Sequence, residues 1–261
     1  MKRTRININP SEYPAELLPY LKDATVFDSS CSPQARVLFI DKDRGYYLKS
    51  AESGSLEREA IMDRYFYQKG LGANVCAYLS TDRDWLLTER IEGEDCCDPL
   101  YMAEPERLCV LYAKTLRMLH EIDGSDCPVQ NRTAEYLQTV ERNYKAGLFD
   151  PDYLPKESQF PDAESAYRFA MEHAHLLKSD TLIHGDYCLP NVLLHNWKFS
   201  KFIDLGNGGI ADRHIDLFWG VWTLNFNFKT DKFRDLFLDA YGRDKIDEAL
   251  FRVIGAMECF G

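Results

Sequence analysis

Residues 183–206 constrain the fold and chemistry of this chain more than any other segment of its sequence. Two apolar runs, at residues 192–195 and 202–205, flank a polar turn at residues 196–198. Apolar runs separated by a short polar turn are typical of a β-hairpin. Polar side chains that a hairpin does not itself require lie on either side of these runs: His184, Asp186, Asn191 and Asp204.

The spacing of these polar residues points to phosphoryl transfer. Four residues separate Asp186 from Asn191, as in the catalytic loop of protein kinases, and Asp204 begins an Asp-Leu-Gly where kinases carry a metal-binding Asp-Phe-Gly. Mg²⁺ prefers oxygen ligands such as carboxylates and amide carbonyls, and a carboxylate can accept the proton of an attacking hydroxyl. Taken singly, each residue is better explained by a turn in which it bonds its own backbone. The ordered set favours kinase-type chemistry.

These motifs resemble a known group of enzymes. His-Gly-Asp at 184–186, followed by Asn191 and Ile-Asp at 203–204, resembles the aminoglycoside phosphotransferase and choline kinase superfamily. Further segments are similar, more narrowly, to the aminoglycoside 3′-phosphotransferases: residues 119–123, 126–128, 188–191, 202–206 and 258–260. The resemblance covers nearly the whole chain. It implies an α+β, bilobal, protein-kinase-like fold with a small antiparallel-sheet N-lobe and a larger, mainly helical C-lobe.

The resemblance also implies an activity. It is the ATP-dependent phosphorylation of an aminoglycoside antibiotic at its 3′-hydroxyl, with Mg²⁺ as cofactor and antibiotic resistance as the effect. Asp186 would be the catalytic carboxylate, and Asn191 and Asp204 would bind the metal. Two other interpretations stay open: a small-molecule kinase for choline, a sugar or another amino alcohol, and a catalytically weak nucleotide-binding module.

The composition of the chain indicates which binding partners and which cellular compartment to expect. The net charge is −11, from 42 acidic and 31 basic residues, opposite in sign to that of most nucleic-acid-binding proteins. An acidic surface suits a polycationic substrate, although it is also ordinary for solubility. We expect no membrane span, because no run of about 18 apolar residues occurs. We expect no signal peptide, because the first residues lack its apolar stretch. The eight cysteines include no Cys-x-x-Cys pair, so we predict that they are reduced thiols in a cytoplasmic protein. We also expect a monomer or weak dimer.

Residues 1–91 are expected to form the nucleotide-binding lobe, and residues 92–261 the catalytic and substrate-binding lobe. Residues 1–22 read as a lead-in without chemistry. Strands are predicted within residues 25–49, at 75–80 and at 85–88, with a helix at 56–68.

Four residues of the first lobe are assigned to the nucleotide by the resemblance. Lys49, at the end of a predicted strand, would contact the α- and β-phosphates, although by itself it reads as a solvated lysine. A helix glutamate would hold Lys49; periodicity does not separate Glu57 from Glu59, and the family pattern selects Glu59. Tyr47 shares a strand face with Lys49 and would stack on adenine. Ser32 would lie in a loop over the nucleotide, or in a plain turn.

In the second lobe, helices are predicted at residues 105–122, 134–146, 164–177, 226–237 and 246–260. We expect His120 to be a packed or dipole-compensating residue. Asp216 would brace the backbone of the catalytic loop. Asp152 and Glu157 lie in a loop that could cover a cleft, and are either substrate-binding carboxylates or solvated loop charges.

The C-terminus carries the last candidates. Glu258 and Phe260 match the acidic, aromatic ending of the family and are predicted to bind the substrate; the alternative for Glu258 is a surface residue at a fraying helix end. Two departures bear on substrate range. Many relatives have a basic residue where this chain has Asn207, and many end at the phenylalanine that Gly261 follows here.

Overall fold

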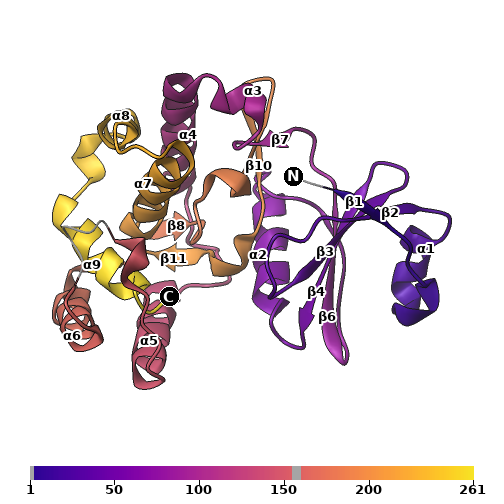
Figure 1. Cartoon of the computed structure of the whole chain (residues 1–261), viewed down its shortest axis with the longest axis horizontal. Coiled ribbons are helices and arrows are strands. Elements are labelled where there is room, and N and C mark those ends of the chain that lie inside the picture. Colours follow the sequence, from indigo (N-terminus) through magenta and orange to yellow (C-terminus); the bar gives the residue numbers. More distant parts are fainter. Residues whose placement is uncertain (1–2, 155–159) are drawn as a thin grey trace. The chain divides into compact units, whose positions relative to one another are not determined.

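The computed structural model describes residues 3–154 and 160–261 (Figure 1). Packing divides the chain into two compact units. The first unit contains residues 1–98 and 191–207, and the second contains residues 99–190 and 208–261. The hairpin therefore packs with the first unit rather than with the helical part of the chain. The division into functional lobes at residue 91 stays a prediction.

A six-stranded antiparallel sheet forms the body of the first unit. Its strands follow the order β1-β2-β3-β4-β6-β5. Their bounds are β1 (Thr4–Ile6), β2 (Thr25–Asp28), β3 (Arg36–Asp41), β4 (Tyr46–Glu52), β5 (Val75–Ser80) and β6 (Arg83–Glu89). The predicted strands are confirmed. Strand β1 was not expected, because three residues are too few to show an alternating pattern.

The two faces of this sheet have different partners. One face, with Leu38, Leu48 and Leu87, packs against the short helical segments of the lead-in: η1 (Pro10–Glu12), η2 (Ala15–Leu17) and α1 (Leu18–Leu21). The other face packs against α2 (Glu57–Gln68), through Ala51 and Ala60. Because side chains alternate along a strand, residues 47, 49 and 51 of β4 share the α2 face. Strand β4 continues to Glu52, so the expectation that Lys49 ends its strand was wrong.

The predicted hairpin is present, with one change of boundary. Strands β9 (Val192–His195) and β10 (Lys198–Phe202) pair antiparallel, and β7 (Glu94–Asp95) pairs with β9. Asn196 and Trp197 have φ angles of 51° and 60°, as a two-residue type I′ turn requires. The second strand therefore ends at Phe202, where we expected it to begin. The helical turn η7 (Leu205–Asn207) follows.

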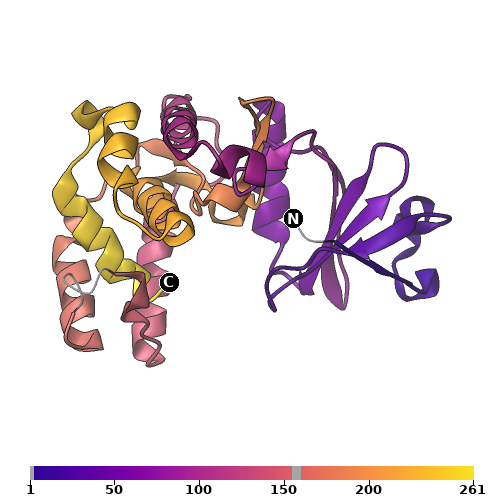
Figure 2. The ribbon, with the colours of Figure 1, turned by 45° about the horizontal axis from the view of Figure 1, so that its top comes forward.

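The second unit is mainly helical, and α6 and α9 lie side by side in it (Figure 1, Figure 2). Its helices are α3 (Pro99–Met102), α4 (Pro105–His120), α5 (Arg132–Lys145), α6 (Ala163–His173), α7 (His214–Phe228), α8 (Phe233–Tyr241) and α9 (Glu248–Glu258). Short helical turns are η3 (Pro151–Tyr153), η5 (Ala174–Leu176), η6 (Leu189–Asn191) and η8 (Arg243–Lys245). Strands β8 (Thr181–Ile183) and β11 (Gly209–Ala211) form a two-stranded antiparallel sheet.

One helix prediction in the second unit was wrong. A single helix was expected at residues 226–237, but α7 ends at Phe228 and α8 begins at Phe233. Lys229, between them, has a left-handed φ of 55° that an α-helix cannot continue. The start of α7 escaped prediction because its residues are apolar around most of the helix, which hides the period of 3.6.

The eight cysteines all fall within the described residues, and all are free thiols. In residues 3–154 and 160–261, no helix is both long enough and apolar enough to span a membrane.

Candidate active site

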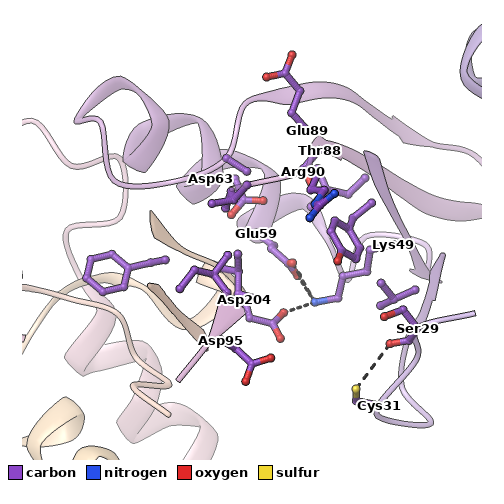
Figure 3. Close-up of a pocket in the computed structure, with 18 of the residues that line it drawn as sticks. Ser29, Cys31, Lys49, Glu59, Asp63, Thr88, Glu89, Arg90, Asp95 and Asp204 are labelled. Carbon is purple, nitrogen blue, oxygen red and sulfur yellow. Dashed lines mark hydrogen bonds and ion pairs between the residues drawn. The ribbon is translucent and has the colours of Figure 1, made fainter. Parts of the chain in front are cut away.

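A pocket of about 410 Å³ opens in the first unit beside Lys49 (Figure 3). Strands β3, β4 and β6 line it, together with α2 and the segment that follows β10. This volume is within the range of small-molecule binding sites. Three of its charged side chains point toward one another in Figure 3: Lys49, Glu59 and Asp204.

Lys49 bridges the two carboxylates. Its Nζ lies 2.8 Å from Glu59 Oε2 and 2.5 Å from Asp204 Oδ1. Burial disfavours the charge on Lys49, but the two carboxylates outweigh it and raise the pKa of the ammonium above its ordinary value. Lys49 is therefore a fixed cation. Its partner on α2 is Glu59 and not Glu57, a choice that periodicity could not make.

Asp204 and Asn191 lie at the base of the hairpin. The backbone N–H of Ile203 donates to the carbonyl of Asn191 at 3.1 Å, which places Asn191 beside the residue that precedes Asp204. Asp204 has a left-handed φ of 61°, and its side chain is half exposed. The two residues supply one carboxylate and one amide oxygen, both hard ligands. This donor set fits a Mg²⁺ ion that takes its remaining ligands from phosphate and water.

The other two nucleotide candidates also line the pocket. Tyr47 and Ser32 face it from β4 and from the loop between β2 and β3. The hydroxyl of Tyr47 accepts a hydrogen bond from Arg3 at 2.6 Å, and the Arg3 guanidinium lies 3.7 Å from the centre of the Phe39 ring. Arg3 could not be predicted as a pocket residue from the sequence, because its place depends on the pairing of the unexpected strand β1.

Four further carboxylates that line the pocket were also missed: Asp63, Glu89, Glu94 and Asp95. Asp95 lies in β7, and Asp63 follows Glu59 by one helical turn on α2. Asp63 is 6% exposed, and burial raises its pKa well above the ordinary value. The spacing of four residues from Glu59 was a usable signal, since it puts both side chains on one helix face.

The loop that carries Asp186 is held by a buried carboxylate of the second unit. Asp216, on α7, is fully buried and accepts the backbone N–H groups of His184 and Gly185, each at 2.7 Å. Its Oδ2 also bonds His120 Nε2 at 3.1 Å, and His120 Nδ1 bonds the hydroxyl of Tyr241 at 2.8 Å. Burial lowers the pKa of His120. The expected bracing of the loop by Asp216 is present, and His120 belongs to the same network.

Glu258 is buried at the end of α9, so the alternative of a surface residue was wrong. Only 5% of it is exposed, and its Oε1 accepts hydrogen bonds from the Tyr136 hydroxyl and, at 3.0 Å, from Trp219 Nε1. Burial raises the pKa of Glu258 to about 7, although both hydrogen bonds oppose this; the negative charge of Asp186 adds to the rise. A carboxyl with such a pKa can hold or release a proton near neutrality.

The remaining substrate candidates differ in exposure. Phe260 is 2% exposed, and its ring stands edge-on to the rings of Tyr144 and Tyr167. The ring therefore belongs to the apolar core, although its substrate role stays a prediction. Asp152 is an exposed residue of η3. Glu157 lies outside the described residues.

Comparison with known proteins shows a consistent likeness. Residues 23–252 match the model of the phosphotransferase enzyme family. A probable aminoglycoside 3′-phosphotransferase of Lactococcus lactis subsp. lactis (strain IL1403) is 49% identical over 262 residues, which cover 100% of this chain and 99% of the relative.

Solved structures share the fold. An aminoglycoside-3′-phosphotransferase of type VIII superposes with a TM-score of 0.75 at 23% identity, covering 96% of each chain. An aminoglycoside phosphotransferase from Streptomyces rimosus, solved with ADP and streptomycin, gives a TM-score of 0.70 at 22% identity over 86% of this chain and 90% of its own. The predicted α+β, kinase-like fold is confirmed.

Proposed function

Because the chain belongs to the phosphotransferase enzyme family, we propose that it transfers the γ-phosphoryl group of ATP to the 3′-hydroxyl of an aminoglycoside antibiotic. The full-length similarity to the Lactococcus relative, which is itself named a probable aminoglycoside 3′-phosphotransferase, supports this substrate class. Phosphorylation would add negative charge to a polycation and weaken its hold on RNA. The effect would be antibiotic resistance.

The observation that carries the proposal is the position of Lys49 between Glu59 and Asp204 in the pocket of the first unit. A fixed ammonium in a pocket of this size is suited to the α- and β-phosphates of ATP. Tyr47 would stack on the adenine, and Ser32 would cover the phosphates. A Mg²⁺ ion held by Asp204 and Asn191 would offset the charge on the phosphate oxygens.

Asp186 would act as the proton acceptor. The hydroxyl oxygen of the aminoglycoside attacks the γ-phosphorus, its proton passes to the carboxylate of Asp186, and ADP leaves. The bonds from Asp216 to the backbone of His184 and Gly185 support this role, because they fix the loop just before Asp186. Positioning a base in this way lowers the entropic barrier to reaction.

Carboxylates of the second unit would hold the ammonium groups of the substrate. Glu258 is a candidate because it lies near enough to Asp186 for the charge of Asp186 to affect its pKa. Asp152 and Glu157 are proposed as further contacts, and Phe260 as a residue that shapes the site. We also propose that the enzyme works in the cytoplasm, as a monomer or weak dimer and without a nucleic-acid partner.

A coupled assay of ADP formation tests the proposal. Purified protein would be given ATP and Mg²⁺ with kanamycin, with choline, with a neutral sugar, or with no acceptor. ADP formation that requires kanamycin is the expected result. Turnover with choline or the sugar but not with kanamycin would identify a different small-molecule kinase. Nucleotide binding without turnover on any acceptor would identify a binding module.

A further inference from the structure

Three aromatic residues of α7 form a continuous stripe on the second unit. Trp219, Trp222 and Phe226 recur at the spacing of one helix face. The ring centroids of Trp219 and Trp222 are 5.3 Å apart, and those of Trp222 and Phe226 are 4.9 Å apart with an interplanar angle of 10°. Phe226 is 53% exposed. Because about half of it is exposed, the Phe226 side chain is available for contact with a ligand.

Helix α7, which carries the stripe, bonds to two parts of the candidate site. Trp219 donates its indole N–H to Glu258. One turn further along α7, the hydroxyl of Thr223 accepts the backbone N–H of Leu189 at 3.3 Å, three residues after Asp186. Helix α7 therefore contacts both Glu258 and the segment that follows Asp186, and the exposed end of the stripe lies on the same helix, one turn beyond Thr223.

The exposed ring already binds a cation. Nζ of Lys229 lies 4.1 Å from the centre of the Phe226 ring. This is within the range in which an ammonium is attracted to the face of an aromatic ring. The face of Phe226 is thus accessible to an ammonium group, and the first ring of the same stripe, Trp219, bonds the carboxyl of Glu258, which we propose as a contact for a positively charged ligand.

We propose that Trp222 and Phe226 form an aromatic platform on which an ammonium-bearing sugar ring of the substrate stacks, in place of the Lys229 ammonium. The platform rests on the proposed function for the identity of its ligand. Together with the carboxylate contacts, the platform would favour a cationic sugar over a neutral one, because the face of an aromatic ring attracts positive charge. Lys229 acts as an internal competitor for the same face.

Calorimetry of kanamycin binding, with a non-hydrolysable ATP analogue and Mg²⁺ present, tests the platform without depending on turnover. Phe226→Leu keeps an apolar side chain and removes the ring face. It should weaken kanamycin binding by roughly 3- to 30-fold, the range expected for the loss of one cation–π contact. Phe226→Tyr should bind as the wild type does. Trp222→Leu should weaken binding in the same direction.

A matched control comes from α2. Tyr67 is an exposed aromatic residue of that helix, 49% exposed against 53% for Phe226. Tyr67→Leu should leave kanamycin binding unchanged, which excludes a general effect of losing a surface ring. Melting curves confirm that each variant is folded.

Substitution of Lys229 should change the affinity for kanamycin in the opposite direction, by strengthening binding. Lys229→Asn is chosen because asparagine tolerates the left-handed backbone at this position. It should tighten kanamycin binding by about threefold in the wild-type background. In the Phe226→Leu background the gain should be smaller, because the ring for which the two ammonium groups compete is gone. An equal gain in both backgrounds would show a purely long-range charge effect and would count against competition for the ring.

The outcomes separate the platform from the proposed function. Wild-type protein that binds and phosphorylates kanamycin, with Phe226→Leu and Trp222→Leu unchanged in affinity, would overturn the platform alone. Kanamycin binding that depends on Phe226 but leads to no phosphorylation would overturn the proposed function alone. A wild type that does not bind kanamycin would overturn both.

Discussion

The indole N–H of Trp219 donates to Oε1 of Glu258 at 3.0 Å, so the carboxyl group at the last turn of α9 is held against α7. Burying an ionised carboxylate this deeply destabilises the folded state. The negative charge of Asp186 contributes to the raised pKa of this carboxyl. Buried carboxyls with raised pKa values are concentrated at functional sites, and the first two predictions concern this residue.

Glu258→Gln should raise the KM for kanamycin and leave the KM for ATP nearly unchanged. Glutamine keeps an oxygen that can accept from Trp219 and Tyr136, so the fold should survive, but it cannot form a charge-assisted bond to an ammonium. Such a bond is worth about 1.5–3 kcal/mol, which corresponds to a loss of roughly 10- to 150-fold in kcat/KM. Steady-state kinetics with each substrate varied in turn would measure this.

The control for this variant is Glu172→Gln, which changes an exposed glutamate of α6. It should leave both KM values unchanged. If Glu258→Gln is folded and its kanamycin KM moves by less than about twofold, Glu258 is a structural residue and not a substrate contact.

The second prediction concerns the pH dependence of stability. The folded pKa of Glu258, about 7, lies above its ordinary value of 4.5, so between these pH values the folded state binds this proton and the unfolded state does not. The stabilising contribution is complete below pH 4.5 and is lost as the pH rises through about 7.

Urea unfolding of the wild type and of Glu258→Gln, at about pH 5 and about pH 8, measures this contribution. The wild type should lose more stability between the two pH values than the variant does, because glutamine does not titrate. Parallel losses in the two proteins would show that Glu258 has the same pKa in the folded and unfolded states.

The third prediction concerns the metal site. Asp204→Ala should abolish turnover and weaken nucleotide binding in the presence of Mg²⁺ more than in its absence, because it removes the carboxylate ligand of the metal. Calorimetry with and without Mg²⁺ compares the two conditions. Asp82→Ala, at an exposed position of the first unit, serves as the control. Equal losses with and without Mg²⁺ would mean that Asp204 acts through Lys49 alone.

The fourth prediction concerns the brace under the catalytic loop. In Asp216→Asn, an amide NH₂ replaces one of the two oxygens that accept from His184 and Gly185. One buried N–H then loses its acceptor, which should cost about 1–3 kcal/mol of unfolding free energy. The kcat should fall while the KM for ATP stays near its wild-type value, because Asp186 loses its fixed position.

Urea unfolding and kinetics measure the two effects of Asp216→Asn, with Asp244→Asn, at an exposed residue, as the control. A variant with normal kcat and reduced stability would limit Asp216 to a structural role.

The sequence was most informative where chemistry or local periodicity fixes a spacing. The interval between Asp186 and Asn191, and the hairpin that follows it, could be recognised because the residue types and their order are both constrained. Helix α2 was recognised for a similar reason, since its residues favour helix and contain no glycine or proline. The choice of Glu59 as the partner of Lys49 came from the family pattern, because helix periodicity alone allowed two glutamates.

The sequence was least informative where a property depends on segments that are distant in the chain. The burial of Glu258 depends on Tyr136 and Trp219, which come from two other helices. The place of Arg3 in the pocket depends on the pairing of β1 with β2, residues that are about twenty positions apart. Neither arrangement leaves a local pattern, so neither could be predicted.

A mass-spectrometric time course of phosphorylation on kanamycin B and on tobramycin, its counterpart without the 3′-hydroxyl, would test the proposed 3′-phosphorylation directly. The wild type should add one phosphoryl group to kanamycin B and none to tobramycin, and Asp186→Asn should slow the reaction by roughly 10²- to 10⁴-fold. Phosphorylation of tobramycin at a rate like that of kanamycin B would contradict the assignment of the 3′-hydroxyl as the acceptor. An Asp186→Asn variant that keeps more than about a tenth of wild-type turnover would contradict the catalytic role of Asp186.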